Sequence, residues 1–245
     1  MPAHGVGFGG LIFLTIAADT TDYNVFVAAG SPSTRVDVVL TINSGVIVYQ
    51  TSANGALISQ SVGGFQTGST LKIVNNGTIC GKGGKGADGG APSNGAASDG
   101  ATGFDAIYFN TPALTVTIDN TNGYILGGGG GGGGGAANLN GGGGGGGGRG
   151  RVGGLGGSRG SVNAGDGAAG SFASAGVGGI ADPAGFSKEG ADGGDWGQPG
   201  NDAAPVSHYG TPGRGGPAGW AINKGATSVT FVGGYNSTQV KGTVA

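Results

Sequence analysis

Cysteine, histidine and charged side chains are all scarce in this sequence of 245 residues. The single cysteine, Cys80, excludes an internal disulfide, so the chain must be stable without one and can fold in a reducing cytoplasm. Two histidines, His4 and His208, and one cysteine make no ligand set for zinc. We therefore interpret Cys80 as a small buried apolar residue, and we predict no metal and no cofactor.

The sequence also lacks the positive charge that a nucleic-acid-binding protein needs. Asp, Glu, Lys and Arg account for 10% of the residues, and the formal net charge is −2. Because nucleic-acid phosphates are bound by basic surfaces, we predict that nucleic acid is not a partner. No apolar run reaches the roughly 18 residues of a membrane-spanning helix, so we also predict that the chain does not span a membrane.

Residues 11–18 form the longest apolar run near the first residue of the sequence. A secretory signal has a positively charged segment before its apolar core, and only His4 precedes this run. We interpret the run as a buried strand. The absence of a signal fits a protein that is released by cell lysis.

Glycine is the abundant residue, at 65 of 245 positions. So much glycine without a Gly-X-Y period is typical of low-complexity or disordered chains. Disorder, however, normally accompanies low hydrophobicity and high net charge, and here 36% of the residues are hydrophobic. We therefore expect the glycine to be held in an ordered structure.

A strand-turn-strand pattern is repeated along the chain. Residues 34–49 alternate β-branched and polar side chains and are interrupted by a turn at Asn43-Ser44-Gly45. Similar patterns, weaker in the last copy, occur at 71–79, 114–125 and 229–235. We interpret them as repeated units whose apolar faces bury one another.

Nearly pure glycine runs follow two of these units directly. The runs occupy 81–90, 127–135, 141–148 and 153–157, and short links with side chains separate them. Isolated polyglycine is a coil, because each residue loses about 1–2 kcal/mol of backbone entropy on ordering. Extended helices of the polyproline type, with three residues per turn, can offset this loss if many of them hydrogen-bond side by side. Glycine is then required because neighbouring backbones leave no room for a Cβ atom.

These patterns predict a mainly β fold with irregular structure and few or no α-helices. We expect a β-rich attachment domain at 1–80 and a polyglycine II sandwich at 81–220 that includes the strand unit 106–126. Residues 221–245 should form strands that pack back on the β layer.

Catalytic and cofactor motifs are weak. The sequence Gly81-Lys82-Gly83-Gly84-Lys85-Gly86 matches the dinucleotide pattern G-x-G-x-x-G, but Gly89, Gly90 and Pro92 exclude the helix that must follow it. Ser207 and His208 are adjacent in sequence, which does not indicate a catalytic triad. The carboxylates at Asp182, Glu189, Asp192 and Asp195 leave calcium binding open, although they lack the alternating spacing of calcium loops. We predict that the protein is not an enzyme.

Recognition is better supported than catalysis, because aromatic residues of the glycine-rich half lie mainly on the links. Large rings among small polar residues are typical of binding surfaces, although each ring could instead cover an edge of the scaffold. The residues that we predict to bind a receptor are Asn94, Phe104, Asn138, Leu139, Asn140, Arg159, Phe186, Lys188, Trp196, His208 and Tyr209.

The strand, the Asn-Gly turn and the pure glycine runs of 71–90 and 114–157 resemble the receptor-binding adhesins at the tips of T-even phage long tail fibres. This resemblance implies a virion protein, made in the host cytoplasm, whose variable links bind a host outer-membrane protein or a surface glycan. It also implies that an N-terminal domain docks on the tail fibre. The sequence of residues 1–70 differs from the attachment segment of that family and is more similar to the β modules of phage tail-tip proteins.

The alternation of runs and links predicts which links lie together. If the runs leave the strand layer at Gly81 and Gly127, the turn at 149–152 is near that layer. The links predicted at the far face are 91–105, 136–140, 158–164, 181–189 and 199–210. An ice-binding or a structural glycine-rich protein is the alternative function. The irregular aromatic links do not fit the regular Gly-X-X repeat of an ice-binding protein, and a structural protein should show many tandem copies and not one compact unit of 245 residues.

Overall fold

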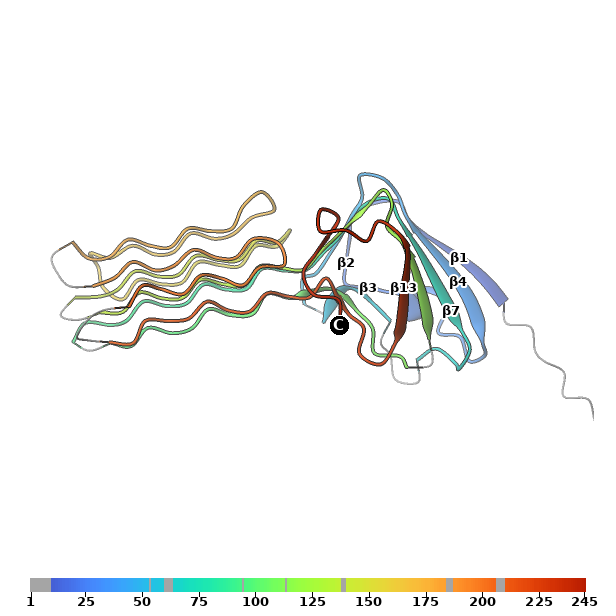
Figure 1. Ribbon diagram of the computed structural model, residues 1–245, viewed down its shortest axis with the longest axis horizontal. Coiled ribbons are helices and arrows are strands. Elements are labelled where there is room, and N and C mark those ends of the chain that lie inside the picture. Colours follow the sequence, from blue (N-terminus) through green and yellow to red (C-terminus); the bar gives the residue numbers. More distant parts are fainter. Residues whose placement is uncertain are drawn as a thin grey trace, which may run out of the picture.

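The protein consists of a β domain and a glycine domain that projects from it (Figure 1). We define the β domain as the described residues within 10–80, 105–126 and 220–245, and the glycine domain as those within 81–104 and 127–219. The computed structural model describes residues 10–52, 54–59, 64–93, 95–112, 114–137, 140–183, 187–205 and 210–245.

Short strands make up the β domain. In chain order they are β1 (Gly10–Ile16), β2 (Thr20–Thr21), β3 (Tyr23–Asn24), β4 (Val36–Ile42), β5 (Ile47–Tyr49), β6 (Gly55–Ile58), β7 (Thr70–Asn75), β8 (Thr78–Cys80), β9 (Asp105–Tyr108), β10 (Thr115–Asp119), β11 (Tyr124–Leu126), β12 (Ile222–Asn223), β13 (Ser228–Gly233) and β14 (Val240–Lys241). In the described part of the chain, α1 (Val25–Ala28) is the only helix, and the Asn24 side chain caps its first amides. No helix among the described residues has the length and apolar character needed to cross a bilayer.

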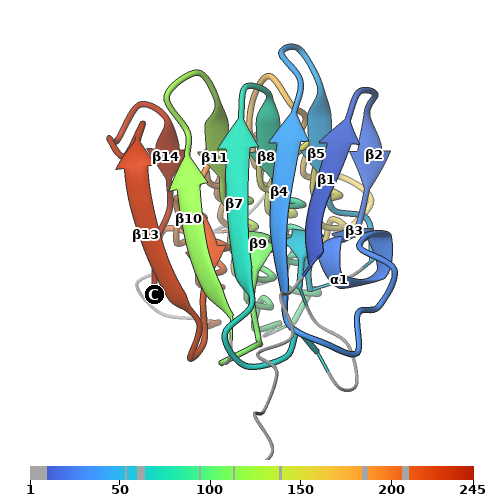
Figure 2. The ribbon, with the colours of Figure 1, turned by 90° about the vertical axis from the view of Figure 1, so that its right-hand side faces the viewer.

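The strands form three parallel sheets. Sheet A has the order β1-β4-β7-β10-β13, sheet B the order β14-β11-β8-β5-β2, and sheet C the order β12-β9-β6-β3. Figure 2 shows sheet A in front, with the strands of sheet B behind it. Along the chain, successive strands join sheets A, B and C in that order, and each new set of strands pairs beside the previous one. The β domain is therefore a solenoid of repeated coils.

Aligned apolar side chains fill this coil. The register places Leu14 beside Leu40, Leu40 beside Ile73, Ile73 beside Ile118, and Ile118 beside Phe231. In β4 buried residues alternate with half-buried ones, as the period of two in its sequence predicts. Burying each large aliphatic side chain contributes about 1.5–3 kcal/mol, so the stacked rows form the main core.

The repeated strand-turn-strand units are present, but the two strands of one unit do not pair with each other. In the unit at 71–79, β7 joins sheet A and β8 joins sheet B, and each strand pairs in parallel with its equivalent in the next unit. At this corner Asn75 and Asn120 are at most 1% exposed, and Asn75 Nδ2 donates to Asn120 Oδ1 at 2.7 Å. Asn75 Oδ1 accepts from the amide of Gly77, which turns the chain into β8.

β1 confirms the strand predicted at 11–18, but only one of its faces is buried. Ile16 is 4% exposed, whereas Leu11 is 60% and Phe13 is 72% exposed. The exposed side chains alternate along β1 with those that pack on the core, so they lie on the outer face of sheet A. Figures 1 and 2 show that this face points away from the glycine domain.

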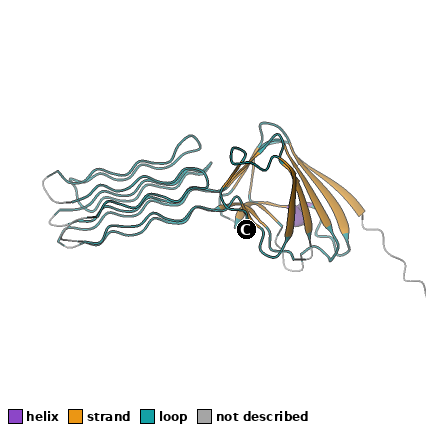
Figure 3. Ribbon diagram, in the orientation of Figure 1, coloured by secondary structure: helices purple, strands orange, loops and turns teal. Residues whose placement is uncertain are grey.

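The glycine domain is inserted twice between sheets B and C. The first insertion runs from β8 to β9 and the second from β11 to β12. Both consist of extended segments that lie side by side (Figure 3). Backbone hydrogen bonds order the segments in layers: 96–104, 81–90 and 153–160; then 211–219, 127–135, 141–148 and 165–170; then 199–204, 188–194 and 175–180.

The two longest pure glycine runs are the central segments of the middle layer. Successive amides of 127–135 bond different neighbours: Gly131 N donates to Ala101 O at 2.9 Å, Gly132 N to Gly146 O at 2.8 Å, and Gly133 N to Asn201 O at 3.0 Å. Carbonyl oxygens of the same run accept bonds from 81–90, 188–194 and 211–219. A Cβ atom on Gly131 would overlap the carbonyl oxygen of Lys85. Because backbone surrounds this segment on all sides, every position in it must be glycine.

Outer segments carry side chains on the surface side only. In 81–90 the residues Lys82, Lys85 and Asp88 recur every third position and are exposed or half-buried, and the glycines between them face the interior. In 96–104 only every third residue faces inward, at Ala97, Gly100 and Gly103. The number of neighbouring segments therefore determines how much glycine a segment needs.

The predicted mainly β fold is confirmed for the described residues, and the sheets are parallel. Strands β9 to β14 complete the sheets that β1 to β8 begin, so the strand unit at 106–126 and the strands after residue 220 pack with the N-terminal strands. The polyglycine II conformation of the segments stays a prediction.

Candidate functional site

The glycine domain has a proximal end against the β domain and a distal end about one segment length away (Figures 1 and 3). At the proximal end Gly81 N donates to Leu126 O, and Gly127 N donates to Lys241 O, both at 2.9 Å. The proximal turns lie at 149–152, 171–174 and 195–198. The chain reverses between described segments at 91–95, 136–140, 161–164, 181–187 and 205–210, which we call the distal turns, and only their described residues belong to the site.

The hydrogen-bonded order of the described segments follows the predicted alternation of near and far turns, but several turns are shorter than the predicted links. Residues 96–104 of the link predicted at 91–105 form an extended segment that returns to β9. Likewise 199–204 is an outer segment rather than a loop. Outer segments tolerate side chains at up to two positions in three, which made them resemble links in the sequence.

Three predicted receptor-binding residues lie at the distal end and within the described part of the chain. Asn140 O accepts a hydrogen bond from Ser187 Oγ at 2.7 Å, and Lys188 N donates to Ala136 O at 3.0 Å. These bonds join the turns at 136–140 and 181–187. Arg159 lies at the distal end of its segment, and its amide donates to Asp166 Oδ1 at 2.8 Å.

Six further predicted residues lie outside the described residues: Asn94, Asn138, Leu139, Phe186, His208 and Tyr209. Ser207 of the Ser-His pair is outside them as well. Their role in receptor binding stays a prediction.

Phe104 and Trp196, the two remaining predicted residues, lie at the proximal end. Phe104 directly precedes β9, and Lys82 Nζ lies 5.9 Å from its ring centre. Trp196 is 3% exposed and packs with Cys80 and Leu126 at the end of sheet B. Neither is near the distal turns, because the chain has reversed direction before it reaches each of them.

Aspartate side chains form hydrogen bonds between neighbouring outer segments. Oδ1 atoms of five aspartates accept a backbone amide from a neighbouring segment at 2.7–2.8 Å. These residues are Asp88, Asp99, Asp166, Asp192 and Asp202. The bond from Ser158 N is the largest of the causes that lower the pKa of Asp88, and Lys85 contributes as well. Each carboxylate replaces a carbonyl acceptor that a further glycine segment would have supplied.

A hydrogen bond and an ion pair account for two of the four acidic residues for which calcium binding was left open. Asp192 accepts from Gly178 N at 2.8 Å, and Asp195 Oδ1 lies 2.6 Å from Arg149 Nη1. Within the described ranges no group of three or more His, Cys, Asp or Glu side chains is placed to hold a metal ion. The dinucleotide-like sequence after β8 is likewise an outer glycine segment, and no helix follows it in the described residues.

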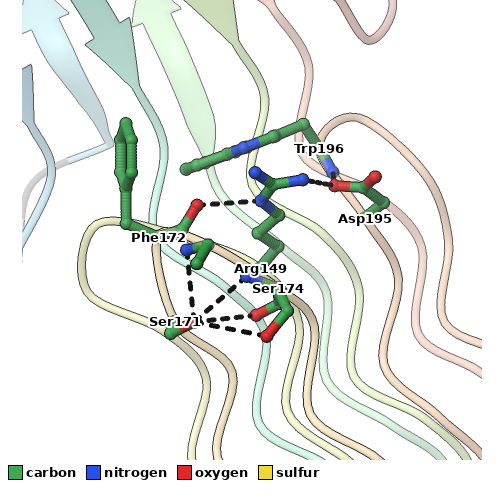
Figure 4. A network of polar contacts seen from close by, with 7 residues as sticks. Arg149, Ser171, Phe172, Ser174, Asp195 and Trp196 are labelled. Atoms are coloured by element: carbon green, nitrogen blue, oxygen red, sulfur yellow. Dashed lines mark hydrogen bonds and ion pairs between the residues drawn. The ribbon is translucent and has the colours of Figure 1, made fainter.

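A polar and aromatic cluster lies at the proximal end and was missed by the sequence analysis (Figure 4). Arg149 Nε donates to Phe172 O at 2.9 Å, and the guanidinium lies 5.3 Å from the centre of the Trp196 ring. The rings of Phe172 and Trp196 meet edge to face at 5.5 Å. The one feature of the sequence that could have indicated this cluster is the position of Arg149, which directly follows the pure glycine run 141–148.

Burial alone would raise the pKa of Asp195 in this cluster. The Trp196 amide and the Arg149 guanidinium together outweigh that effect, so the pKa of Asp195 is lowered, and the charge of Lys241 contributes. Asp195 is therefore ionised at neutral pH.

A groove of about 540 Å³ extends along the side of the glycine domain near the distal turns. It lies between the segments 188–194 and 199–204 and is lined mainly by polar side chains, including Lys188, Glu189 and Asp202. Of these, only Lys188 was predicted from the sequence. The groove adds surface beside Ala181 and Ser187 of one distal turn and beside Ala204 at the end of the segment 199–204.

The comparisons with known proteins agree with this architecture. The model of the family described as "Phage tail fibre adhesin Gp38" matches residues 12–245. Among solved structures, the crystal structure of the gp37-gp38 adhesin tip complex of the bacteriophage S16 long tail fibre is similar, with a TM-score of 0.57 and 22% identity over 95% of this chain and 82% of that chain. None of the curated proteins compared with the chain matches it. The family resemblance predicted from the sequence is confirmed.

Proposed function

The chain belongs to the phage tail fibre adhesin Gp38 family, and from this premise we propose that it attaches a phage to its host through the distal turns of the glycine domain. As an adhesin it is a binding protein of the virion, not an enzyme, an ice-binding protein or a cell-wall protein. We further propose that it lies at the tip of a long tail fibre, in keeping with the S16 complex.

The observation that carries this proposal is that the turns gather at one end of a scaffold made almost entirely of backbone. The inner segments pack through backbone N–H and C=O groups, and aspartate side chains add bonds only between outer segments. A change of sequence in a distal turn therefore leaves the packing of the segments unchanged. Such a scaffold suits a protein whose receptor-binding residues must vary while its fold stays constant.

We propose that the segments are polyglycine II helices. The support is the period of three in their hydrogen bonds: Gly84, Ala87 and Gly90 donate to Gly129, Gly132 and Gly135 at 2.9–3.0 Å. A helix with three residues per turn repeats its contacts at this interval. The same period explains why Lys82, Lys85 and Asp88 all point outward.

The described residues proposed to contact the receptor are Asn140, Arg159 and Lys188, with the side groove beside Lys188. The predicted residues at 94, 138, 139, 186, 208 and 209 complete the proposed surface. The receptor is a host outer-membrane protein or a surface glycan. Both classes fit loops that combine amide, cationic and aromatic side chains.

The β domain supplies the opposite end, which we propose binds the tail fibre. The outer face of sheet A points away from the distal turns and exposes Leu11, Phe13 and Val232, the last at 63%. The S16 protein is found in a complex with gp37. By analogy, a fibre-end protein is the partner that would cover these apolar side chains.

Exchange of turns tests the receptor-binding proposal. The turns at 136–140 and 181–187 are replaced by those of a family member that infects another host, and adsorption of the phage to both hosts is measured. We expect adsorption to follow the donor of the turns. The control exchanges the turn 43–45, which joins β4 to β5 in the β domain, and should leave host range unchanged. Unaltered host range after the distal exchange would refute the proposal.

A further inference from the structure

A pocket of about 510 Å³ lies at the junction of the two domains, remote from the distal turns. It is formed by strands of sheet B, by proximal turns of the glycine domain and by the chain between β13 and β14. The lining residues are Thr78, Tyr124, Leu126, Arg149, Phe172, Trp196, Ser237, Thr238 and Lys241. Pockets between domains that combine aromatic walls with a few polar groups are typical ligand sites.

The floor of the pocket is the outer face of sheet B. The register places Tyr124 beside Thr78, and Leu126 beside Lys241. Adjacent strands are about 4.8 Å apart, so these side chains form a continuous surface. Tyr124 is 45% exposed, which leaves its ring accessible to a ligand.

The wall of the pocket is the cluster in Figure 4, and its side chains are held in place. Phe172 is 37% exposed and contacts Trp196 edge to face. Its turn is closed by Ser171, whose N donates to Ser174 O at 2.8 Å and whose Oγ accepts from Ser174 N at 3.1 Å. Because Arg149 also bonds the carbonyl oxygen of Phe172, the wall is preorganised and costs little to order on binding.

Positive charge exceeds negative charge around the pocket. Arg149 and Lys241 line it, and Asp195, which pairs with Arg149, is the carboxylate in contact with the cluster. In the part of the chain that the structure describes, Lys241 makes no direct ion pair, and its charge acts on Asp195 only from a longer distance. Its ammonium group is therefore available to an anion.

We propose that this pocket binds a sugar ring that carries a carboxylate or a phosphate. The C–H face of a pyranose is apolar and fits the exposed rings of Tyr124 and Phe172. Hydroxyl groups of Thr78, Ser237 and Thr238 can exchange hydrogen bonds with those of the sugar. Lys241, supported by Arg149, binds the anionic group through charge-assisted hydrogen bonds.

The position of the pocket connects this ligand to the host surface, a step that rests on the proposed receptor-binding function. A nine-residue segment such as 127–135 spans about 28 Å at a rise of about 3.1 Å per residue. When the distal turns contact a protein at the membrane, the pocket is held about that far outside it. Surface polysaccharides occupy this zone. The pocket then adds a second contact to the same cell and raises avidity.

Saturation-transfer NMR of the full chain tests the site. The probe is a pool of oligosaccharides cut from acidic capsular and O-antigen polysaccharides, which extend outward from the cell and carry carboxylate or phosphate groups. We expect saturable binding that weakens at least tenfold in Tyr124→Ala and in Lys241→Gln. Tyr124→Phe keeps the ring and should bind within about twofold of the unchanged protein.

Control variants lie outside the pocket. Tyr235→Ala and Lys224→Gln remove the same chemical groups elsewhere and should bind the probe normally. Probes lacking phosphate, and probes with reduced carboxyl groups, identify which anion is bound. The proposal is overturned if the oligosaccharide does not bind, if a neutral oligosaccharide binds equally well, or if the pocket variants bind like the unchanged protein. None of these results bears on the exchange of distal turns, so the two proposals can fail separately.

Discussion

The side-chain amide of Asn75 donates a hydrogen bond to the side-chain oxygen of Asn120 at 2.7 Å, although the two residues are 45 positions apart in the chain. They occupy the same corner of consecutive coils, and Asn120 Nδ2 continues the row by donating to Gly234 O at 3.2 Å. Each buried amide is therefore satisfied by the next coil. The row of side chains fixes the direction in which the chain turns from sheet A into sheet B.

Asn120→Ala should destabilise the β domain by about 2 kcal/mol. The substitution removes the acceptor of Asn75 and the donor to Gly234, and leaving buried polar groups unpaired costs about 1–3 kcal/mol. Urea unfolding followed by circular dichroism measures the change. Asn122→Ala is the matched control, because Asn122 lies in the same turn, is exposed and bonds only Asn76 among the contacts described. Equal effects of the two substitutions would contradict the role given to the buried row.

Gly131→Ala should destabilise the glycine domain by about 3 kcal/mol. Its Cβ atom would overlap the carbonyl oxygen of Lys85, and overpacking of this kind costs about 1–3 kcal/mol or more. For a chain of this size the expected fall in melting temperature is roughly 6–12 °C. Gly10→Ala serves as control, because no atom lies within 4 Å of a Cβ atom at Gly10. A melting temperature unchanged by Gly131→Ala would show that the central segment is not closely packed.

Two aspartates should respond to pH in opposite directions. The pKa of Asp88 is lowered, chiefly by the Ser158 amide, so its stabilising contribution is present above about pH 4 and is lost as pH falls through the lowered pKa. Burial raises the pKa of Asp105, although hydrogen bonds from Trp220 N and the Asn223 side chain oppose the shift. The folded state therefore favours the protonated carboxyl, and the contribution of Asp105 to stability is lost as pH rises through the raised pKa.

Urea unfolding at pH 3 and pH 7 distinguishes these cases. The destabilisation caused by Asp88→Asn should be larger at pH 7 than at pH 3. The destabilisation caused by Asp105→Asn should instead be smaller at pH 7 than at pH 3. The interpretation fails if both substitutions depend on pH in the same direction.

Cys80 should not react with iodoacetamide in the folded protein at pH 8. The thiol is fully buried, and burial raises its pKa to about 12, so almost no thiolate is present. Mass spectrometry should find the residue unmodified in the native protein and modified in denaturing urea. Because Cys80 packs against Leu126 and Trp196, rapid labelling would mean that the junction of the two domains opens readily.

Phe13→Asp should prevent docking on the fibre without unfolding the β domain. Phe13 is 72% exposed, and exposed substitutions usually change stability by no more than about 0.5 kcal/mol. Co-purification with the fibre-end protein provides the measurement. Val162→Asp places the same charge on an apolar residue that is 81% exposed in a distal turn, and it should leave docking intact. Normal docking of the Phe13 variant would exclude this face of sheet A as the interface.

The sequence predicts the strands well, because β-branched residues alternate with polar ones in 34–49 and its repeats. It does not predict how the strands pair. Leu40, Ile73 and Ile118 would alternate in the same way in an antiparallel hairpin, and the parallel register depends on buried contacts such as that of Asn75 with Asn120.

For the candidate site, the sequence predicts the reversals of the chain but not the length of each turn. Phe104 seemed to belong to a distal link because 96–104 contains little glycine, yet an outer segment requires a small residue only at every third position. The contact between Arg149 and Asp195 joins residues 46 positions apart. It depends on several reversals of the chain between them, which no local pattern reveals.

The chain crosses from the β domain to the glycine domain and back at both insertions, beside Cys80, Asp105, Leu126 and Ala221. Leu126 lies next to Cys80 in sheet B, and Ile222 lies next to Ile107 in sheet C. If the distal turns bind the host as proposed, tension on them divides among four covalent crossings and enters sheets B and C at once. No single crossing then carries the whole load, because the crossings adjoin hydrogen-bonded strands.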